Sequence, residues 1–205
     1  MMMKSDVKPV TITADTVAAD DDGISANAAV GDNAALTIGG ALASGGSVTL
    51  DHARKVTITS SGNDSSISFT IVGTDVNGDD QTEELDGANA GTATSSNYFL
   101  TIASITAVGD PAANVKAGIS DDAADVVFAG RSRLKGANLV STATAGTVDI
   151  LTTSPSGTSV MKLRSVASAT ASQDVTVPEC GVLFTDGIYV QYTVSTFHTA
   201  TFYHA

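Results

Sequence analysis

The chain has 205 residues, of which 22 are acidic and 10 are basic, so its formal net charge at pH 7 is −12. This charge disfavours direct binding to nucleic acid or to anionic membranes, and a single cysteine, Cys180, excludes an intramolecular disulfide and is expected to pack as a small apolar side chain. The first residues lack the apolar region of a signal peptide and no 18 apolar residues follow one another, so we expect neither a visible export signal nor a membrane-spanning segment.

Residues 1–34 are predicted to form an extended N-terminal arm. Val10-Thr-Ile-Thr could pair as a short strand, but the run from Asp20 to Ala34 has no period that would bury one face. Such an arm either docks on a neighbouring protein or stays disordered, and the sequence leaves both possibilities open.

Residues 35–120 are predicted to form an N-terminal β module, because short apolar and Thr-rich runs alternate with glycine-containing turns. The expected strands are 35–39, 47–50, 55–60, 66–73, 81–86, 98–108 and 114–116. Period-two alternation predicts that one face of these strands is buried. The predicted core residues are Val56, Ile58, Ile67, Phe69, Ile71, Ile102 and Ile105, with either Phe99 or Leu100.

The pair Asn77-Gly78 is the strongest turn signal in this module. A type I′ turn requires positive φ at both central residues, and asparagine and glycine tolerate this conformation best. We therefore expect a β hairpin with a type I′ turn at this position.

Residues 119–125, Ile-Ser-Asp-Asp-Ala-Ala-Asp, are interpreted as a polar connector, and residues 121–205 as a C-terminal β-sandwich module. Its expected strands are 133–140, 146–152, 160–163, 174–177, 181–184, 188–194 and 197–203, with turns at 154–157 and 185–187. In the strand from residue 188, the side chains of Ile188, Val190, Tyr192 and Val194 share one face.

The predicted fold class is therefore all-β, with two antiparallel sandwich or jelly-roll-like modules behind the arm. Ala, Thr, Ser, Gly and Val dominate the composition, Trp is absent, and the chain has only 6 Phe and 4 Tyr. Small side chains bury little apolar area to offset chain entropy. We therefore expect the modules to gain stability from each other, from further copies or from a larger assembly.

The charge is unevenly distributed along the chain. Residues 1–124 carry 17 acidic and 5 basic side chains, whereas residues 125–205 carry 5 of each. Solubility explains such an acidic part, and a match to a basic partner surface or to cations is the alternative. The C-terminal basic residues are Arg131, Arg133, Lys135, Lys162 and Arg164, which would form a positive patch if their strands were neighbours.

Two patterns that could indicate chemistry fail on their context. Residues 73–84 match most of the EF-hand ligand spacing, but Gly73 occupies the first ligand position and both flanks alternate as strands. Ser159 and Lys162 have the spacing of serine acylases, which place this motif on a helix rather than a strand. Weak cation binding by acidic loops such as 20–22 and 79–80 stays open.

Histidines do not indicate a metal site either. His198 and His204 are expected on one face of the last strand but about 20 Å apart, too far to share an ion, and His52 is distant in sequence. We therefore predict no catalytic, cofactor-binding or metal-binding residue and no enzymatic activity.

Several stretches resemble a β module of virion structural proteins of tailed bacteriophages, especially marine phages and cyanophages. They are Asp20-Asp-Asp-Gly-Ile-Ser-Ala, Gly40-Ala-Leu-Ala-Ser-Gly-Gly, Ala53-Arg-Lys-Val-Thr-Ile-Thr-Ser, Phe69-Thr-Ile-Val-Gly-Thr-Asp-Val-Asn-Gly, Gly87-Ala-Asn-Ala-Gly-Thr-Ala-Thr and Tyr98-Phe-Leu-Thr-Ile-Ala-Ser-Ile. Gly181-Val-Leu-Phe-Thr-Asp-Gly-Ile-Tyr-Val resembles a second β module that often ends such proteins. Together the two resemblances cover most of residues 20–205.

The resemblance implies a non-enzymatic component of the virion, assembled in the host cytoplasm. A capsid decoration or cement protein fits best, with the major capsid protein and copies of itself as partners, for example as a trimer. A tail or head-to-tail component is the alternative, in the neck, tube or baseplate. A host-attachment or carbohydrate-binding module fits less well, because such modules usually expose aromatic side chains for stacking.

Overall fold

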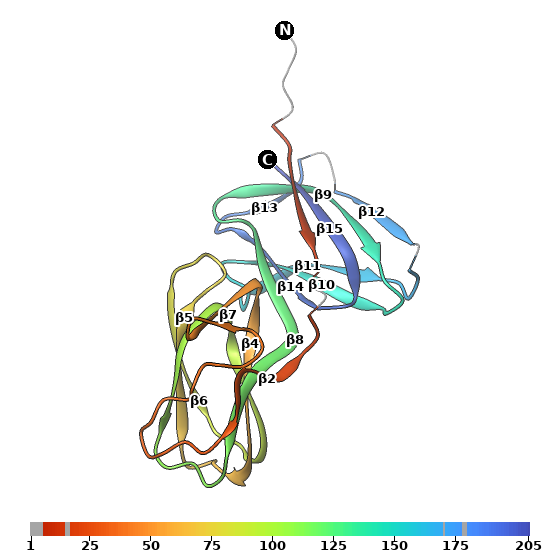
Figure 1. Cartoon of the computed structure of the whole chain (residues 1–205). Coiled ribbons are helices and arrows are strands. Elements are labelled where there is room, and N and C mark those ends of the chain that lie inside the picture. Colours follow the sequence, from red (N-terminus) through yellow and green to blue (C-terminus); the bar gives the residue numbers. More distant parts are fainter. Residues whose placement is uncertain (1–5, 15–16, 170, 178–179) are drawn as a thin grey trace. The chain divides into compact units, whose positions relative to one another are not determined.

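The computed structural model describes residues 6–14, 17–169, 171–177 and 180–205, and its strands form two large antiparallel sheets (Figure 1). Within these residues there is no helix, which confirms the predicted all-β class. The chain separates into two compact units. One consists of Val17–Ala123, here called the 17–123 unit, and the other joins Met1–Thr16 to Ala124–Ala205 and is called the terminal unit.

A curled sheet forms the 17–123 unit, with strand order β8-β4-β7-β5-β6. Two further strands add to it, because β2 pairs with β8 and β3 pairs with β4. The strands are β2 (Asp20–Ala28), β3 (Ala43–Ser44), β4 (Ser47–Asn63), β5 (Ser68–Thr74), β6 (Asp80–Asp86), β7 (Asn89–Val108) and β8 (Val115–Phe128). The predicted strands 47–50 and 55–60 are thus parts of one long strand, β4. The predicted strand 35–39 is reduced to a single bridge between Ala35 and Thr106.

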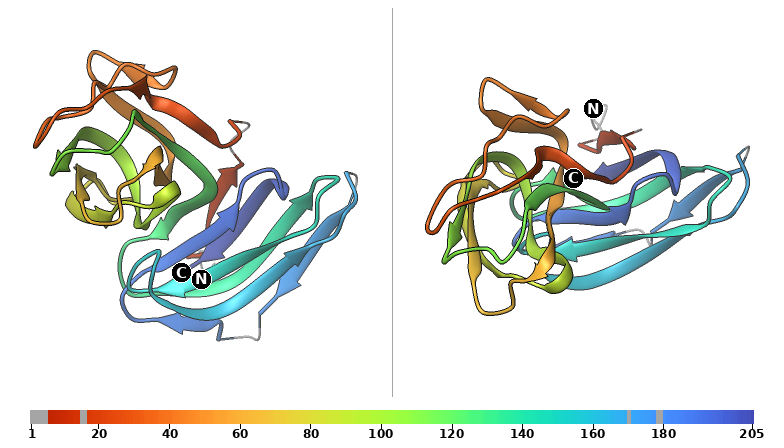
Figure 2. Two further views of the ribbon diagram at one scale, coloured as in Figure 1. Left: turned by 90° about the horizontal axis from the view of Figure 1, so that it is seen from below. Right: turned by 60° about the horizontal axis from the view of Figure 1, so that its bottom comes forward.

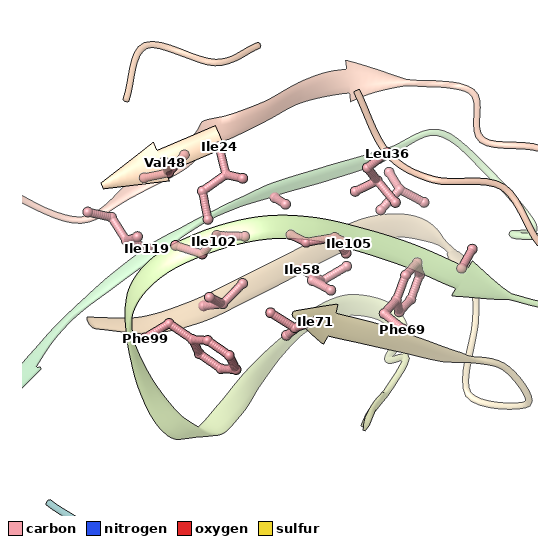
Figure 3. Packing of buried hydrophobic residues seen from close by; sticks show 14 of the residues in the cluster. Ile24, Leu36, Val48, Ile58, Phe69, Ile71, Phe99, Ile102, Ile105 and Ile119 are labelled. Atoms are coloured by element: carbon pink, nitrogen blue, oxygen red, sulfur yellow. The ribbon is translucent and has the colours of Figure 1, made fainter. Parts of the chain in front are cut away.

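The core of this unit is the predicted one. Figure 3 shows Ile58, Phe69, Ile71, Phe99 and Ile102 packed together inside the curled sheet. All predicted core positions are buried except Ile67, which is partly buried, and Phe99 rather than Leu100 is the buried member of that pair. Strand β2 and the segment after it cover the sheet with Ile24, Leu36 and Leu42.

A β-bulge in β7 explains why Ile102 and Ile105 are both buried although they are three residues apart. Val72 of β5 lies opposite Ser104, whereas the next residue, Gly73, lies opposite Ile102, so Ala103 is the extra residue. The extra residue shifts the alternation by one position and returns both isoleucines to the core face.

The β5–β6 hairpin forms as predicted, but its turn is not of type I′. Gly78 has a φ of 86°, while Asn77 has a negative φ. The side chain of Asp75 holds the turn instead, because its Oδ1 accepts hydrogen bonds from the backbone N–H groups of Asn77 (2.7 Å) and Asp79 (3.0 Å). A local Asp side chain therefore replaces the second positive-φ residue.

Two sheets face each other in the terminal unit, and Figure 2 shows its cyan-to-blue strands in two layers. One sheet has the order β1-β15-β9-β12, with β13 also paired to β9, and the other places β11, β10 and β14 side by side, followed by the end of β8. The strands are β1 (Lys8–Thr13), β9 (Ser132–Ser141), β10 (Gly146–Thr152), β11 (Thr158–Ser165), β12 (Ser172–Thr176), β13 (Val182–Phe184), β14 (Ile188–Thr193) and β15 (Phe197–His204).

The predicted apolar face of β14 lies in the core of this sandwich. Ile188, Val190, Tyr192 and Val194 are all buried. The ring of Tyr192 packs edge-on against Phe197 with 4.8 Å between centroids, and its hydroxyl donates a 2.7 Å hydrogen bond to Asp125. The buried phenol thus keeps a polar partner, as a buried tyrosine requires.

The N-terminal segment differs from the predicted arm. Within its described part, β1 pairs along its whole length with β15, from Lys8 opposite His204 to Thr13 opposite Thr199. Strand β2 pairs with β8. Both stretches are therefore strands in the sheets of their own chain. Residues 1–5 and 15–16 of the predicted arm lie outside the described residues.

The predicted connector at residues 119–125 is also a strand, because β8 runs without interruption from Val115 to Phe128. Ile119, Ala123 and Ala124 of this stretch are buried. Because two of these buried residues are alanines, the sequence shows no clear alternation of apolar and polar side chains here. The resulting division, with 17–123 as one unit, differs from the predicted segments 1–34, 35–120 and 121–205.

Candidate functional site

Charge is separated between the two units. The 17–123 unit contains 15 acidic and 3 basic side chains and so carries the entire net charge of −12. The terminal unit contains 7 acidic and 7 basic side chains and is neutral. The acidity of the chain is therefore a property of the 17–123 unit alone.

The strands that carry the basic residues of the C-terminal half are not neighbours in one sheet. Arg133 and Lys135 lie on β9, whereas Lys162 and Arg164 lie on β11 in the other sheet. The guanidinium of Arg133 donates to the backbone carbonyls of Cys180 (3.1 Å) and Gly181 (3.2 Å), and the Lys135 ammonium donates to Cys180 (3.3 Å). These two cations hold the segment that leads into β13. The condition for one joint patch, that the two strands are neighbours, is therefore not met.

Cys180 itself is exposed, against the expectation that it packs as a small apolar residue. The next residue, Gly181, has a φ of 71°, and a Cβ there would lie 2.5 Å from the carbonyl oxygen of Leu134. The chain turns at this point close against β9, and this turn places the Cys180 side chain outside the core.

A pocket of about 390 Å³ lies at the start of β1 and the end of β15. Its lining residues are Asp6, Lys8, Phe128, Arg131, Ser132, His204 and Ala205. The His204 ring packs against Phe128 with 4.9 Å between centroids, and its Nδ1 lies 3.3 Å from the Ser132 hydroxyl oxygen. Burial lowers the pKa of His204 below its usual 6.5, and the nearby charge of Lys8 lowers it further.

We expect the free energy of unfolding to decrease as the pH falls below about 6.5, because the unfolded chain binds a proton at His204 that the folded chain resists. The stability that depends on a neutral His204 is fully present above that pH and is lost as the pH falls toward the lowered pKa of the folded state. Urea unfolding at pH 7 and pH 5 measures this loss, and His204→Phe should reduce it. The exposed His198 is the control: His198→Gln should leave the pH dependence as in the wild type. An unchanged pH dependence in His204→Phe would contradict this assignment.

The two C-terminal histidines do not share a face. A bulge at His198 places Phe197 opposite Ser141 and Thr199 opposite Val140, so His198 is turned to the exposed face while His204 is buried. The sequence pattern alone gave no sign of this bulge.

A second pocket, of about 520 Å³, lies between the edges of the two sheets of the terminal unit. Its apolar lining comes from Leu139, Met161, Leu163 and Val175, and its polar lining from Lys162, Arg164, Gln173 and Asp174. Lys162 also forms an ion pair of 2.8 Å with Asp149 on β10. The pocket is thus an apolar groove with a basic rim along β11.

In the 17–123 unit the carboxylates of Asp20, Asp21 and Asp22 lie together, with ligand atoms within 4.8 Å of one another. Asp21 already pairs with the Lys116 ammonium. Residues 73–84 form the β5–β6 hairpin rather than a calcium loop, as the strand-like flanks predicted. Ser159 and Lys162 likewise lie on a strand, where both donate to Asp149.

The most unusual buried group in the 17–123 unit is Arg54, whose side chain has no exposed surface. Its Nε donates to the backbone carbonyl of Ser120 (2.9 Å), Nη2 donates to the same oxygen, and Nη1 donates to that of Val17 (3.2 Å). Asp121 lies 4.0 Å from Nη2. Arg54 therefore fastens β4 to β8 and to the start of the unit, a role that the sequence did not reveal.

A comparison with protein-family models, with curated proteins and with solved structures found no match to this chain. Among the described residues, no helix is long and apolar enough to cross a lipid bilayer.

Proposed function

We propose that this chain is a non-enzymatic structural protein of a tailed-phage virion, a decoration or cement protein that binds the outside of the head and stabilises it. The proposal rests on the resemblance of residues 20–205 to virion β modules. The observation that supports it most is the separation of charge, with a net charge of −12 on the 17–123 unit and a neutral terminal unit. A protein with one strongly charged unit suits attachment to a surface of opposite charge.

In this role the acidic unit would face basic patches of the major capsid protein. The neutral terminal unit would be free to contact further copies of the chain. Exposed carboxylates outside β6, such as those of Asp22, Asp32 and Asp51, provide the charge for the first contact. Attachment of this kind weakens with salt, because contacts between exposed charges are screened over about 10 Å at 0.1 M ionic strength.

The proposed function does not require sugar binding. Three of the four tyrosines, Tyr98, Tyr189 and Tyr192, are buried, and Tyr203 is 39% exposed. A stacking platform for carbohydrate would need exposed aromatic rings. Host attachment is therefore not proposed.

Location on the particle tests this proposal directly. Antibodies against the purified chain, detected by gold labelling in electron microscopy of intact particles, should label the head over its whole surface. Label confined to the neck or tail would replace the decoration role with the tail or head-to-tail alternative. The virion assignment would be overturned if intact particles bound no antibody and denatured particles also contained no such protein.

A further inference from the structure

We propose that copies of this chain bind one another edge to edge, with β11 of one copy pairing with β6 of the next. On a phage particle this contact would join neighbouring copies, and that role rests on the proposed function. The contact itself is a property of the purified protein. Its failure in solution and the absence of the protein from virions are therefore separate results.

Both strands are the last of their sheets. Among the residues that the structure describes, β11 is paired only with β10 and β6 only with β5, so each has one edge without a neighbouring strand there. An open edge presents backbone N–H and C=O groups that can pair with a strand of another chain. Such strand addition is a common mode of protein recognition.

The open edge of β6 is acidic. Asp80, Glu84 and Asp86 of this strand are exposed, and the strand has no basic residue. The Glu84 carboxylate also accepts a 2.6 Å hydrogen bond from the Ser68 hydroxyl of β5. The other face is fixed to β7, because the Gln81 amide donates to the Tyr98 carbonyl (2.9 Å) and Glu83 accepts from two backbone N–H groups of β7. These bonds hold the first half of β6 in place, so its last residues, Glu84 to Asp86, are the ones offered for pairing.

The open edge of β11 is basic. Lys162 and Arg164 are exposed, while Leu163 between them is buried and lines the apolar groove. The two end strands of the other sheet, β1 and β12, carry one charged side chain each, Lys8 and Asp174. Strand β2 also carries carboxylates, at Asp20 to Asp22, but Asp21 among them already pairs with Lys116. The edges of β6 and β11 thus carry opposite charge.

The charges and the apolar residues of the two edges match in register. Side chains on a strand alternate between faces, so exposed residues must lie opposite exposed residues and buried opposite buried. In an antiparallel pairing, Arg164 lies opposite Glu84, Leu163 opposite Leu85, and Lys162 opposite Asp86. Leu85 is partly buried on the core side of β6, as Leu163 is on β11, so the apolar faces also continue across the junction.

The same charges disfavour the other edge pairings. Two β6 edges would bring carboxylates together, and two β11 edges would bring cations together, which is unfavourable for directly opposed residues. The contact is therefore heterologous, joining unlike edges and leaving one of each kind free for a further copy. A short contact of this kind is weak between two copies and gains strength when many copies sit side by side on a shell.

Sedimentation velocity of the purified full-length chain, from micromolar to millimolar concentration, tests the proposal. The wild type should show a mass that rises with concentration above the 20.6 kDa of the monomer, and high salt should reduce this rise. Glu84→Lys/Asp86→Lys makes both edges basic and should weaken association by about tenfold or more. Lys162→Glu/Arg164→Glu makes both edges acidic and should have the same effect.

Mixing the two variants gives the decisive result. Each edge of one variant then meets an oppositely charged edge of the other, so the mixture should recover the association that each variant has lost alone. Lys162→Glu also places a carboxylate beside Asp149 and could change β11 for that reason alone. Arg164→Glu by itself keeps the Lys162 ion pair, so it serves as a second variant of the β11 edge. Circular dichroism should show that all variants stay folded.

Asp51→Lys/Asp110→Lys is the matched control, because it changes the net charge equally at exposed positions outside β6 and β11. It should associate at least as strongly as the wild type. A wild type that remains monomeric up to millimolar concentration would overturn the proposal. So would edge variants that associate as well as the wild type, or a mixture of folded variants that fails to recover association.

Discussion

Replacing Arg54 with alanine should lower the free energy of unfolding by about 4 kcal/mol. The substitution removes the donors that serve the backbone carbonyls of Ser120 and Val17, and removal of the buried Arg54 side chain leaves a cavity. Arg54→Lys should recover about half of this loss, because an ammonium keeps the charge but cannot place two nitrogens on the Ser120 carbonyl oxygen. Urea unfolding followed by circular dichroism measures both losses.

The neighbouring residue Lys55 provides the control for Arg54. Its ammonium lies 5.2 Å from the centre of the Tyr98 ring and its side chain is partly exposed, so Lys55→Ala should cost less than about 1 kcal/mol. Equal losses for the two alanine variants would mean that Arg54 does not fasten β4 to β8. Amide hydrogen exchange should then also show no faster opening at β8 in Arg54→Ala.

The second large effect is expected at Gly73, which lies opposite the bulge in β7. A Cβ at this position would lie 1.9 Å from the carbonyl oxygen of Thr101, so Gly73→Ala forces β5 and β7 apart at the bulge. We expect a loss of about 3 kcal/mol in the free energy of unfolding, because the backbone itself must move. Thermal and urea unfolding of the variant measure this loss.

Gly91 in β7 is the matched control for Gly73. A Cβ there meets no atom closer than 3.8 Å, so Gly91→Ala should change stability by no more than about 0.5 kcal/mol. A Gly73→Ala variant as stable as Gly91→Ala would show that the two strands do not approach closely at Gly73. The bulge at Ala103 would then not account for the burial of both Ile102 and Ile105.

Alternation of apolar residues with Thr and Ser was enough to predict most of the strands. It works because each strand has one buried face, so the positions of Val56, Ile58, Phe69 and Ile71 in the sequence directly give their side of the sheet. It fails where a bulge adds a residue, since the bulge at His198 arises from pairing with a distant strand and leaves no local mark.

The predicted arm and connector show a different limit of the sequence. Ile24 and Ala123 are fully buried, but alanine, serine and glycine around them give no contrast between an inner and an outer face. Their burial depends on close backbone contact: a Cβ at Gly118 would lie 1.9 Å from the carbonyl oxygen of Asp20. Packing of this kind is decided by which strands meet, and a single sequence does not contain that information.

Surface features could be predicted only in part. The excess of acidic residues and the five basic ones were visible in the sequence, but their grouping depends on strand order. Lys162 and Arg164 lie on β11, the last strand of its sheet, whereas Arg133 lies on β9, which has neighbouring strands on both sides. Arg54, which reads as a surface cation in a Thr-rich strand, is fully buried.

The central claim, that this chain is a virion component, is tested most directly by its copy number in purified phage particles. Quantitative mass spectrometry against the major capsid protein gives this ratio. A decoration or cement protein should be present in hundreds of copies, equal to the number of capsid subunits or a simple fraction of it. A dozen copies or fewer would assign it to the neck or tail, and absence from the particles would contradict the account.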